Sequence, residues 1–141
     1  MTNQEYLAHV PLFEGLRRGD LERIGRLAIQ RSFKKGETII AEGESGIALY
    51  VIISGKVRVV KQIGGRERVL RTLGPNEYFG EMALLDEFRR SASVVAEEDT
   101  ECLLLVRWDF RAELHLHPEI ALHILPLLSR RLREAEERAG L

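Results

Sequence analysis

The chain has 141 residues, which is the size of one ordinary globular domain. Hydrophobic residues make up 45% of it and charged residues 30%, so the chain can bury a core and is not expected to be disordered. Its 21 basic and 22 acidic side chains leave a formal charge of −1, so no net field draws the chain to nucleic acid or to a membrane surface.

The first thirty residues are predicted to be helical. Apolar residues cluster between positions 7 and 13, where Pro11 interrupts them. Asp20 is interpreted as the N-cap of a helix, because apolar residues follow it at helical spacing between 21 and 28. The helical pattern ends near Arg31. No secretory signal opens the sequence and no apolar stretch could span a bilayer, so we expect a soluble, cytoplasmic protein.

From residue 31 to residue 107 the pattern changes to short β segments separated by glycines. Gly55-Lys56 and Gly64-Gly65 are two tight-turn signals, and each is expected to close a hairpin between the strands that flank it. The single cysteine, Cys102, is expected to be a buried thiol in a strand. Many short strands with glycine turns indicate a sandwich, a jelly roll or a barrel. The strands are predicted at 38–40, 49–53, 57–60, 69–70, 92–96 and 102–106.

After Trp108 the helical period returns, and Pro118 marks the start of the last helix. Pro126 is expected to kink this helix, because it lacks the backbone N–H and clashes with the preceding turn. The charged last turns predict ion pairs between residues four apart. The sequence contains no internal repeat or linker, so we predict one domain over 1–141, with helices in 1–30, a β-barrel in 31–107 and helices in 108–139. The predicted ion pairs are Arg130–Glu134, Arg133–Glu137 and Glu134–Arg138.

The stretch from Phe79 to Val94 interrupts the strands with a short, apolar, helix-like segment. Gly80 allows the backbone to come close to a ligand, and the helical turn that follows it would offer free N–H groups to an anion. Arg90 has the planar guanidinium that suits a phosphate, and Glu81 offers an acceptor for a hydroxyl group. Together these residues describe a nucleotide site.

The segment 79–84, Phe-Gly-Glu-Met-Ala-Leu, followed by Arg90-Ser91-Ala92-Ser93-Val94, resembles the phosphate-binding cassette of the cyclic-nucleotide-binding domain family. Five shorter segments resemble the family in the same order, and the resemblance covers about residues 11 to 133. It implies a mainly β fold with flanking helices: a double-stranded β-helix (jelly-roll) barrel with N-terminal helices and a C-terminal lid helix, as in catabolite-activator-like effector domains. The five segments are 36–40, 43–44, 49–52, 54–57 and 73–75.

The resemblance also implies the roles of individual residues. Arg90 and Ser91 would bind the cyclic phosphate, and Glu81 would accept a hydrogen bond from the ribose 2′-hydroxyl. The segment 70–74 resembles the matching strand of cGMP-selective sites in cGMP-dependent kinases, so Arg71 favours cGMP, while cAMP is the default for the family. Arg131 on the lid helix would stack on the purine. The ligand-binding residues are expected to be Phe79, Gly80, Glu81, Met82, Ala83, Arg90, Ser91, Ala92, Arg71, Leu73 and Arg131.

The function expected is therefore regulatory binding of cAMP, with cGMP as the alternative ligand, and signalling by movement of the C-terminal helix. We expect no catalysis, no metal, no cofactor, no membrane segment and no contact of this chain alone with nucleic acid. His115 and His117 fall in the helical tail, away from the strands where a metal enzyme of this barrel type would place its ligands. The output partner is unknown, and an apolar seam on the last helix would permit a homodimer.

Two other interpretations stay open at this point. Catabolite-activator-type regulators place a dimer helix and a DNA-binding unit after such a domain, and only ten residues follow Arg131. The chain could thus be the effector fragment of such a regulator. It could also be a degenerate interaction module that binds no nucleotide, although the presence of Glu81 and Arg90 argues against that.

Overall fold

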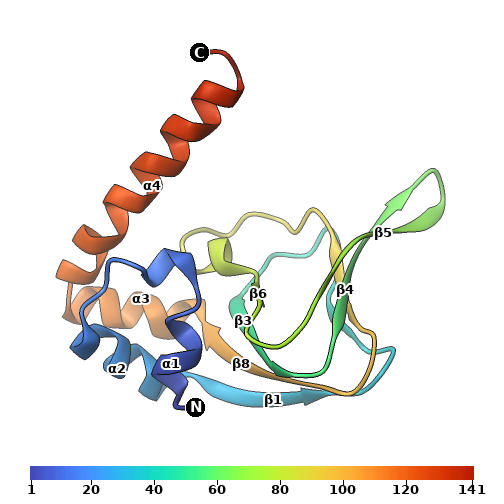
Figure 1. Ribbon diagram of the computed structural model, residues 1–141, viewed down its shortest axis with the longest axis horizontal. Coiled ribbons are helices and arrows are strands. Elements are labelled where there is room, and N and C mark those ends of the chain that lie inside the picture. Colours follow the sequence, from blue (N-terminus) through green and yellow to red (C-terminus); the bar gives the residue numbers. More distant parts are fainter.

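The computed structural model describes residues 1–141, and its centre is a pair of four-stranded sheets in which every strand pairing is antiparallel (Figure 1). This confirms the predicted mainly β architecture. The first sheet has the order β1 (Ile29–Phe33), β8 (Thr100–Val106), β3 (Ala48–Ser54), β6 (Tyr78–Phe79). The second has the order β2 (Thr38–Ile40), β7 (Ser93–Ala96), β4 (Val57–Ile63), β5 (Arg66–Leu73).

The longer helices gather at one end of the sheets, and α4 extends away from the rest of the molecule toward the C-terminus (Figure 1). The helix α4 continues through Pro126 to Arg138. None of the helices is both long enough and apolar enough to cross a membrane. The helical segments are α1 (Asn3–Leu7), η1 (Pro11–Phe13), α2 (Arg18–Leu27), η2 (Glu81–Leu84), α3 (Arg107–Leu116) and α4 (Glu119–Arg138).

Strand β3 separates two hydrophobic cores. Because successive side chains of a strand point to opposite faces, Leu49 and Val51 pack with the helices while Tyr50 and Ile52 pack between the sheets. All four side chains are buried. The run of five consecutive buried residues at the start of β3 explains why its sequence is continuously apolar rather than alternating.

Two predictions about local structure were wrong. Gly55-Lys56 does not close a hairpin, because β3 pairs with β6 and β8 while β4 pairs with β5 and β7, so this turn carries the chain from one sheet to the other. Strand β1 already begins at Ile29, inside the region predicted to be helical, because its pairing with β8 replaces the helical pattern. The Gly64-Gly65 hairpin is confirmed, with Ile63 opposite Arg66.

Asp20 is not an N-cap. It is the third residue of α2, whose N-cap is Arg17, and its side chain is buried. The three predicted ion pairs along the end of α4 are also absent from the ion pairs of the structure. Arg130 pairs instead with Glu14, just after η1, at 3.2 Å. Contacts between distant segments have replaced the local ones that spacing suggested.

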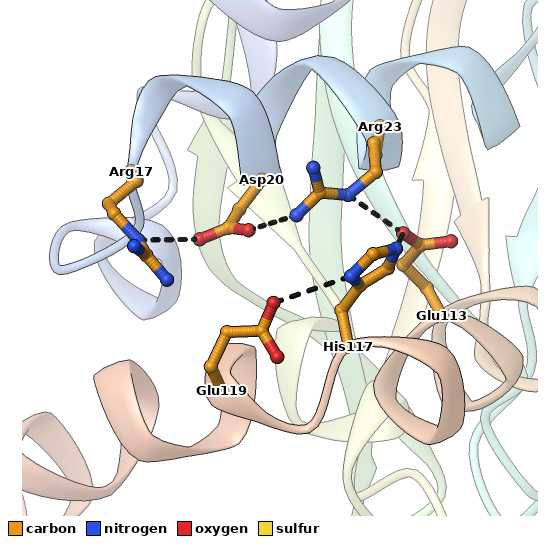
Figure 2. Close-up of polar contacts among 6 residues, drawn as sticks. All are labelled: Arg17, Asp20, Arg23, Glu113, His117 and Glu119. Carbon is orange, nitrogen blue, oxygen red and sulfur yellow. Dashed lines mark hydrogen bonds and ion pairs between the residues drawn. The ribbon is translucent and has the colours of Figure 1, made fainter.

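A network of charged side chains ties α2 to the corner between α3 and α4 (Figure 2). Arg23 pairs with Asp20 of its own helix and donates to Glu113 of α3, with 3.2 Å between Nε and Oε1. His117 lies between Glu113 and Glu119, at 3.7 Å and 3.3 Å. These two contacts make His117 part of the network, and no group of three or more His, Cys, Asp or Glu side chains is placed to hold a metal.

Candidate functional site

A cavity of about 540 Å³ lies beside η2, a volume usual for small-molecule sites. A smaller recess of about 130 Å³ shares Arg71, Phe79, Gly80 and Arg90 with it and adds Ser91 and Ala92. The fold therefore brings together the two separate segments that the sequence predicted. The main cavity is lined by Arg71, Leu73, Asn76, Glu77, Tyr78, Phe79, Gly80, Glu81, Met82 and Arg90.

Gly80 begins the short helix η2 in the left-handed region, with φ 81°. A Cβ atom at this position would lie 2.6 Å from Nη2 of Arg90 and 2.7 Å from the carbonyl oxygen of Ala48. Both the backbone conformation and the close backbone carbonyl of Ala48 therefore require glycine, and a larger residue would also displace the Arg90 side chain. The ring of Tyr50 stacks on the ring of Phe79, the residue before Gly80, with the centroids 4.8 Å apart, and this contact supports the start of the cassette.

Arg90 reaches into the site as a cation without a carboxylate partner. Its Nη2 donates to the carbonyl of Ala48 at 3.1 Å, and its Nε is buried with no hydrogen-bond partner. Burial lowers the pKa of the Arg90 guanidinium, because it disfavours the charged form. Gly46 makes room for this side chain, since a Cβ there would lie 2.2 Å from Nε. An anion in the cavity would give the Arg90 guanidinium the negatively charged partner that the protein does not supply.

Glu81 carries the second unpaired polar atom of the site. Its Oε1 lies 3.2 Å from Nη1 of Arg131 on α4, while its Oε2 is buried without a partner. Arg131 also lies 3.8 Å from the sulfur of Met82. Glu81 thus has one oxygen held by the predicted lid helix and one oxygen free to accept a hydrogen bond from a ligand hydroxyl.

A β-bulge delivers Arg71 to the cavity. Val59 pairs with Arg71 and Val60 with Val69, which leaves Leu70 as the extra residue on β5. Bulges of this kind redirect a neighbouring side chain. Arg71 lines both cavities, whereas its neighbours Val69 and Leu70 line neither.

Of three further residues predicted for the site, Ala83, Leu73 and Arg131, only Leu73 lines a cavity. Ala83 is buried and lines neither cavity, so the structure gives it a packing role in the cassette. Leu73 lines the cavity and is buried. Arg131 contacts Glu81 and Met82 from α4, which is the side on which the lid helix was predicted.

Sequence reasoning missed three residues that line the cavity, Asn76, Glu77 and Tyr78. Asn76 is the one non-glycine residue with a positive φ, 69°, and Glu77 accepts a hydrogen bond from the backbone N–H of Gly74 at 2.9 Å. The Gly-Pro-Asn run before them is a turn signal that could have drawn attention to this loop. Burial, reinforced by the charge of Glu81, raises the pKa of Tyr78.

Known proteins resemble the chain over most of its length. The family profile described as "Cyclic nucleotide-binding domain" matches residues 30–117. The "Cyclic AMP receptor protein" of Thermus thermophilus is 47% identical over 127 residues, which cover 89% of this chain and 59% of that protein. The "cGMP-dependent protein kinase" of Toxoplasma gondii is 42% identical over 105 residues, 74% of this chain and 10% of the kinase. The chain thus spans only part of these relatives.

A solved structure resembles the whole chain. The crystal structure of the N-terminal domain of a transcriptional regulator from Streptomyces coelicolor superposes with a TM-score of 0.87 at 32% identity. The match covers 96% of this chain and 95% of that one. The arrangement of sheets, cassette and C-terminal helix is therefore shared with a domain of known structure.

Proposed function

Because the chain belongs to the cyclic nucleotide-binding domain family, we propose that it is a regulatory module that binds cAMP in the cavity beside η2 and performs no chemistry on it. One observation carries this proposal. Nε of Arg90 and Oε2 of Glu81 are both buried without partners, and both residues line the same cavity. Buried polar atoms are rarely left unpaired unless a ligand or water completes them.

The two unpaired groups match the two polar parts of a cyclic nucleotide. A guanidinium donates to phosphate oxygens in a charge-assisted bond, and a carboxylate accepts from a ribose hydroxyl. Arg90 would therefore hold the cyclic phosphate, with the hydroxyl of Ser91 in the adjoining recess, and Glu81 would hold the ribose. The base would extend toward Arg71, Leu73 and the lid helix α4.

The choice of base is a separate question, since the relatives are named for both nucleotides. The longer match, to a cyclic AMP receptor protein, favours cAMP. Arg71 favours cGMP, because an arginine can donate to the O6 and N7 acceptors of guanine, whereas adenine presents a donor at the first of these positions. We propose cAMP as the ligand, with cGMP as the competitor in the test below.

The signal would be a change in the position of α4. Leu127 is the last buried residue of this helix, and beyond it two ion pairs hold the helix to the domain, Arg130 to Glu14 and Arg131 to Glu81, both at 3.2 Å. A nucleotide that bonds to the free Oε2 of Glu81 would thus be linked to α4 through one of these two connections. This gives the bound and free states a difference in contacts, which a ligand-driven switch requires.

We also propose that α4 pairs with a second copy of the chain. Leu122, Leu125 and Leu132 are exposed large apolar side chains spaced three and seven residues apart, which is the spacing of a helix-pairing seam. Sedimentation velocity of the wild type and of Leu125→Glu tests this. A dimer that the substitution dissociates is expected, and a monomeric wild type across the accessible concentrations contradicts it.

Calorimetric titration with cAMP, and separately with cGMP, tests the proposed function. Arg90→Ala is the informative variant, and Arg89→Ala, an exposed neighbour without an ion pair, is the control. Loss of Arg90 should weaken binding by about 2–5 kcal/mol, since it removes the one partner of a buried anion. The variant should fold nearly as stably as the wild type, because the lost cation had no carboxylate partner and donated only to the carbonyl of Ala48. No heat with either nucleotide, repeated by fluorescence competition, would instead identify a degenerate interaction module.

A further inference from the structure

A second arginine, Arg107, contacts the cassette but does not line either cavity. Arg107 is the first residue of α3, and its side chain is only 11% exposed. Its Nη1 donates to the carbonyl oxygens of Gly46 at 2.8 Å and Asp86 at 3.1 Å, and lies 3.5 Å from that of Ala83. Its Nη2 lies 3.7 Å from Glu87. One guanidinium therefore joins three backbone carbonyls from two separate loops.

Those carbonyls belong to the two segments that flank the Arg90 side chain, which are η2 with Gly80 at its start and the loop that contains Gly46. Ala83 and Asp86 lie at the end of η2, where the last carbonyls of a helical turn have no partners within it. Gly46 lies directly against the Arg90 guanidinium. Arg107 thus fixes the end of the cassette relative to the backbone on which Arg90 rests.

Arg107 also connects these two segments to the base of the lid. Its backbone N–H donates to the carbonyl of Ile47 at 2.8 Å, so the first turn of α3 is hydrogen-bonded to the same loop that carries Gly46. A displacement of the cassette would therefore be transmitted to α3. From α3 it would pass through the α3–α4 corner to the lid helix α4. No other charged side chain bridges η2, this loop and α3.

We propose that Arg107 is a positioning residue for ligand binding, which acts by holding Arg90 and the end of η2 in the geometry that receives an anion. This inference rests on the proposed function, because it concerns the same site. Arg107 contributes no atom to the cavity, and its effect on affinity therefore passes through Arg90. A residue needed only for folding would change the amount of active protein and leave the affinity of the folded fraction unchanged.

The test is calorimetric titration of Arg107→Ala, Arg107→Lys and the control Arg111→Ala with cAMP and cGMP. Arg111 lies one turn further along α3, is exposed and forms no ion pair. We expect Arg107→Ala to weaken binding about tenfold with an unchanged stoichiometry, because two charge-assisted hydrogen bonds and a longer contact with Ala83 are lost. Arg107→Lys should recover part of this, since an ammonium group can reach only some of the carbonyls, and Arg111→Ala should stay within about twofold.

A double-mutant cycle shows whether the effect passes through Arg90. In an Arg90→Lys background, Arg107→Ala should weaken binding by less than about twofold, because the guanidinium that it positions is gone. An equal loss in both backgrounds, an unchanged affinity, or a fall in stoichiometry at constant affinity would overturn the inference. If the wild type binds neither nucleotide, the proposed function has failed; if the wild type binds and the Arg107 variants bind equally well, this inference alone has failed.

Discussion

Glu81 and Arg131 join the cassette to the lid helix: Oε1 of the carboxylate lies 3.2 Å from Nη1 of the guanidinium, and both side chains are partly shielded from water. The other carboxylate oxygen is buried and unpaired. A ligand hydroxyl could therefore bond to Glu81 without displacing Arg131, and under the proposed function the carboxylate would then join the nucleotide to α4.

This connection predicts that Arg131→Ala weakens cAMP binding by about 3- to 10-fold, roughly the size of one charge-assisted hydrogen bond reduced by partial exposure. Arg130→Ala is the matched control, since its side chain pairs with Glu14 rather than with the cassette. Titration calorimetry of both variants measures the difference. Tighter binding by Arg131→Ala would show that Arg131 competes with the nucleotide for Glu81.

Gly80 is predicted to be irreplaceable for two separable reasons. Alanine at a left-handed position costs about 1–2 kcal/mol in stability. At Gly80 its Cβ would also displace Arg90, so Gly80→Ala should weaken binding more than tenfold. Gly65→Ala isolates the first effect, because Gly65 has φ 78° and no atom within 4 Å of its Cβ position. Urea unfolding and titration are the measurements. A binding loss in Gly80→Ala no larger than that in Gly65→Ala would mean that the close contacts of Gly80 with Arg90 and Ala48 do not matter for binding.

The sequence predicted most of the residues that line the cavity, because they belong to local motifs. The cassette from Phe79 to Met82 and the later Arg90 are recognisable as a pattern, and the fold places them around one cavity. The Gly64-Gly65 hairpin was also predictable, since a hairpin turn is specified by the residues within it. Arg71 was found by resemblance, although the bulge at Leu70 that aims it could not be foreseen.

The missed features depend on contacts between distant segments. Gly55-Lys56 has the composition of a hairpin turn, but which sheet each flanking strand joins is decided by β7 and β8, much later in the chain. Arg130 was assigned to a neighbour four residues away and pairs with Glu14 instead. No local signal marks Arg107, because its three carbonyl partners become neighbours only when two loops meet at α3.

Cys102 is predicted to be chemically inert in the folded protein. The residue is fully buried, and burial raises the pKa of its thiol to about 12. Ellman's reagent should therefore leave the native chain unlabelled at pH 8 and label one thiol after denaturation. The unfolded thiol ionises near pH 8.5, so the stability gained from keeping it protonated is complete below that pH and is lost as the pH rises toward 12. Rapid labelling of the native protein would contradict the buried position.

Two ion pairs of equal length on α2 are predicted to contribute unequally to stability. Arg23 reaches the buried Glu113 and Arg18 reaches the exposed Glu22, both at 3.2 Å. Glu113→Gln should cost about 1–3 kcal/mol in the free energy of unfolding, because it leaves Arg23 in a shielded place with only Asp20 opposite it. Glu22→Gln should cost less than about 0.5 kcal/mol, since water solvates both partners. Urea unfolding of the two variants makes the comparison. Similar losses would mean that the network in Figure 2 does not fix the α3–α4 corner, and α4 would then be held to the domain chiefly by its buried apolar residues.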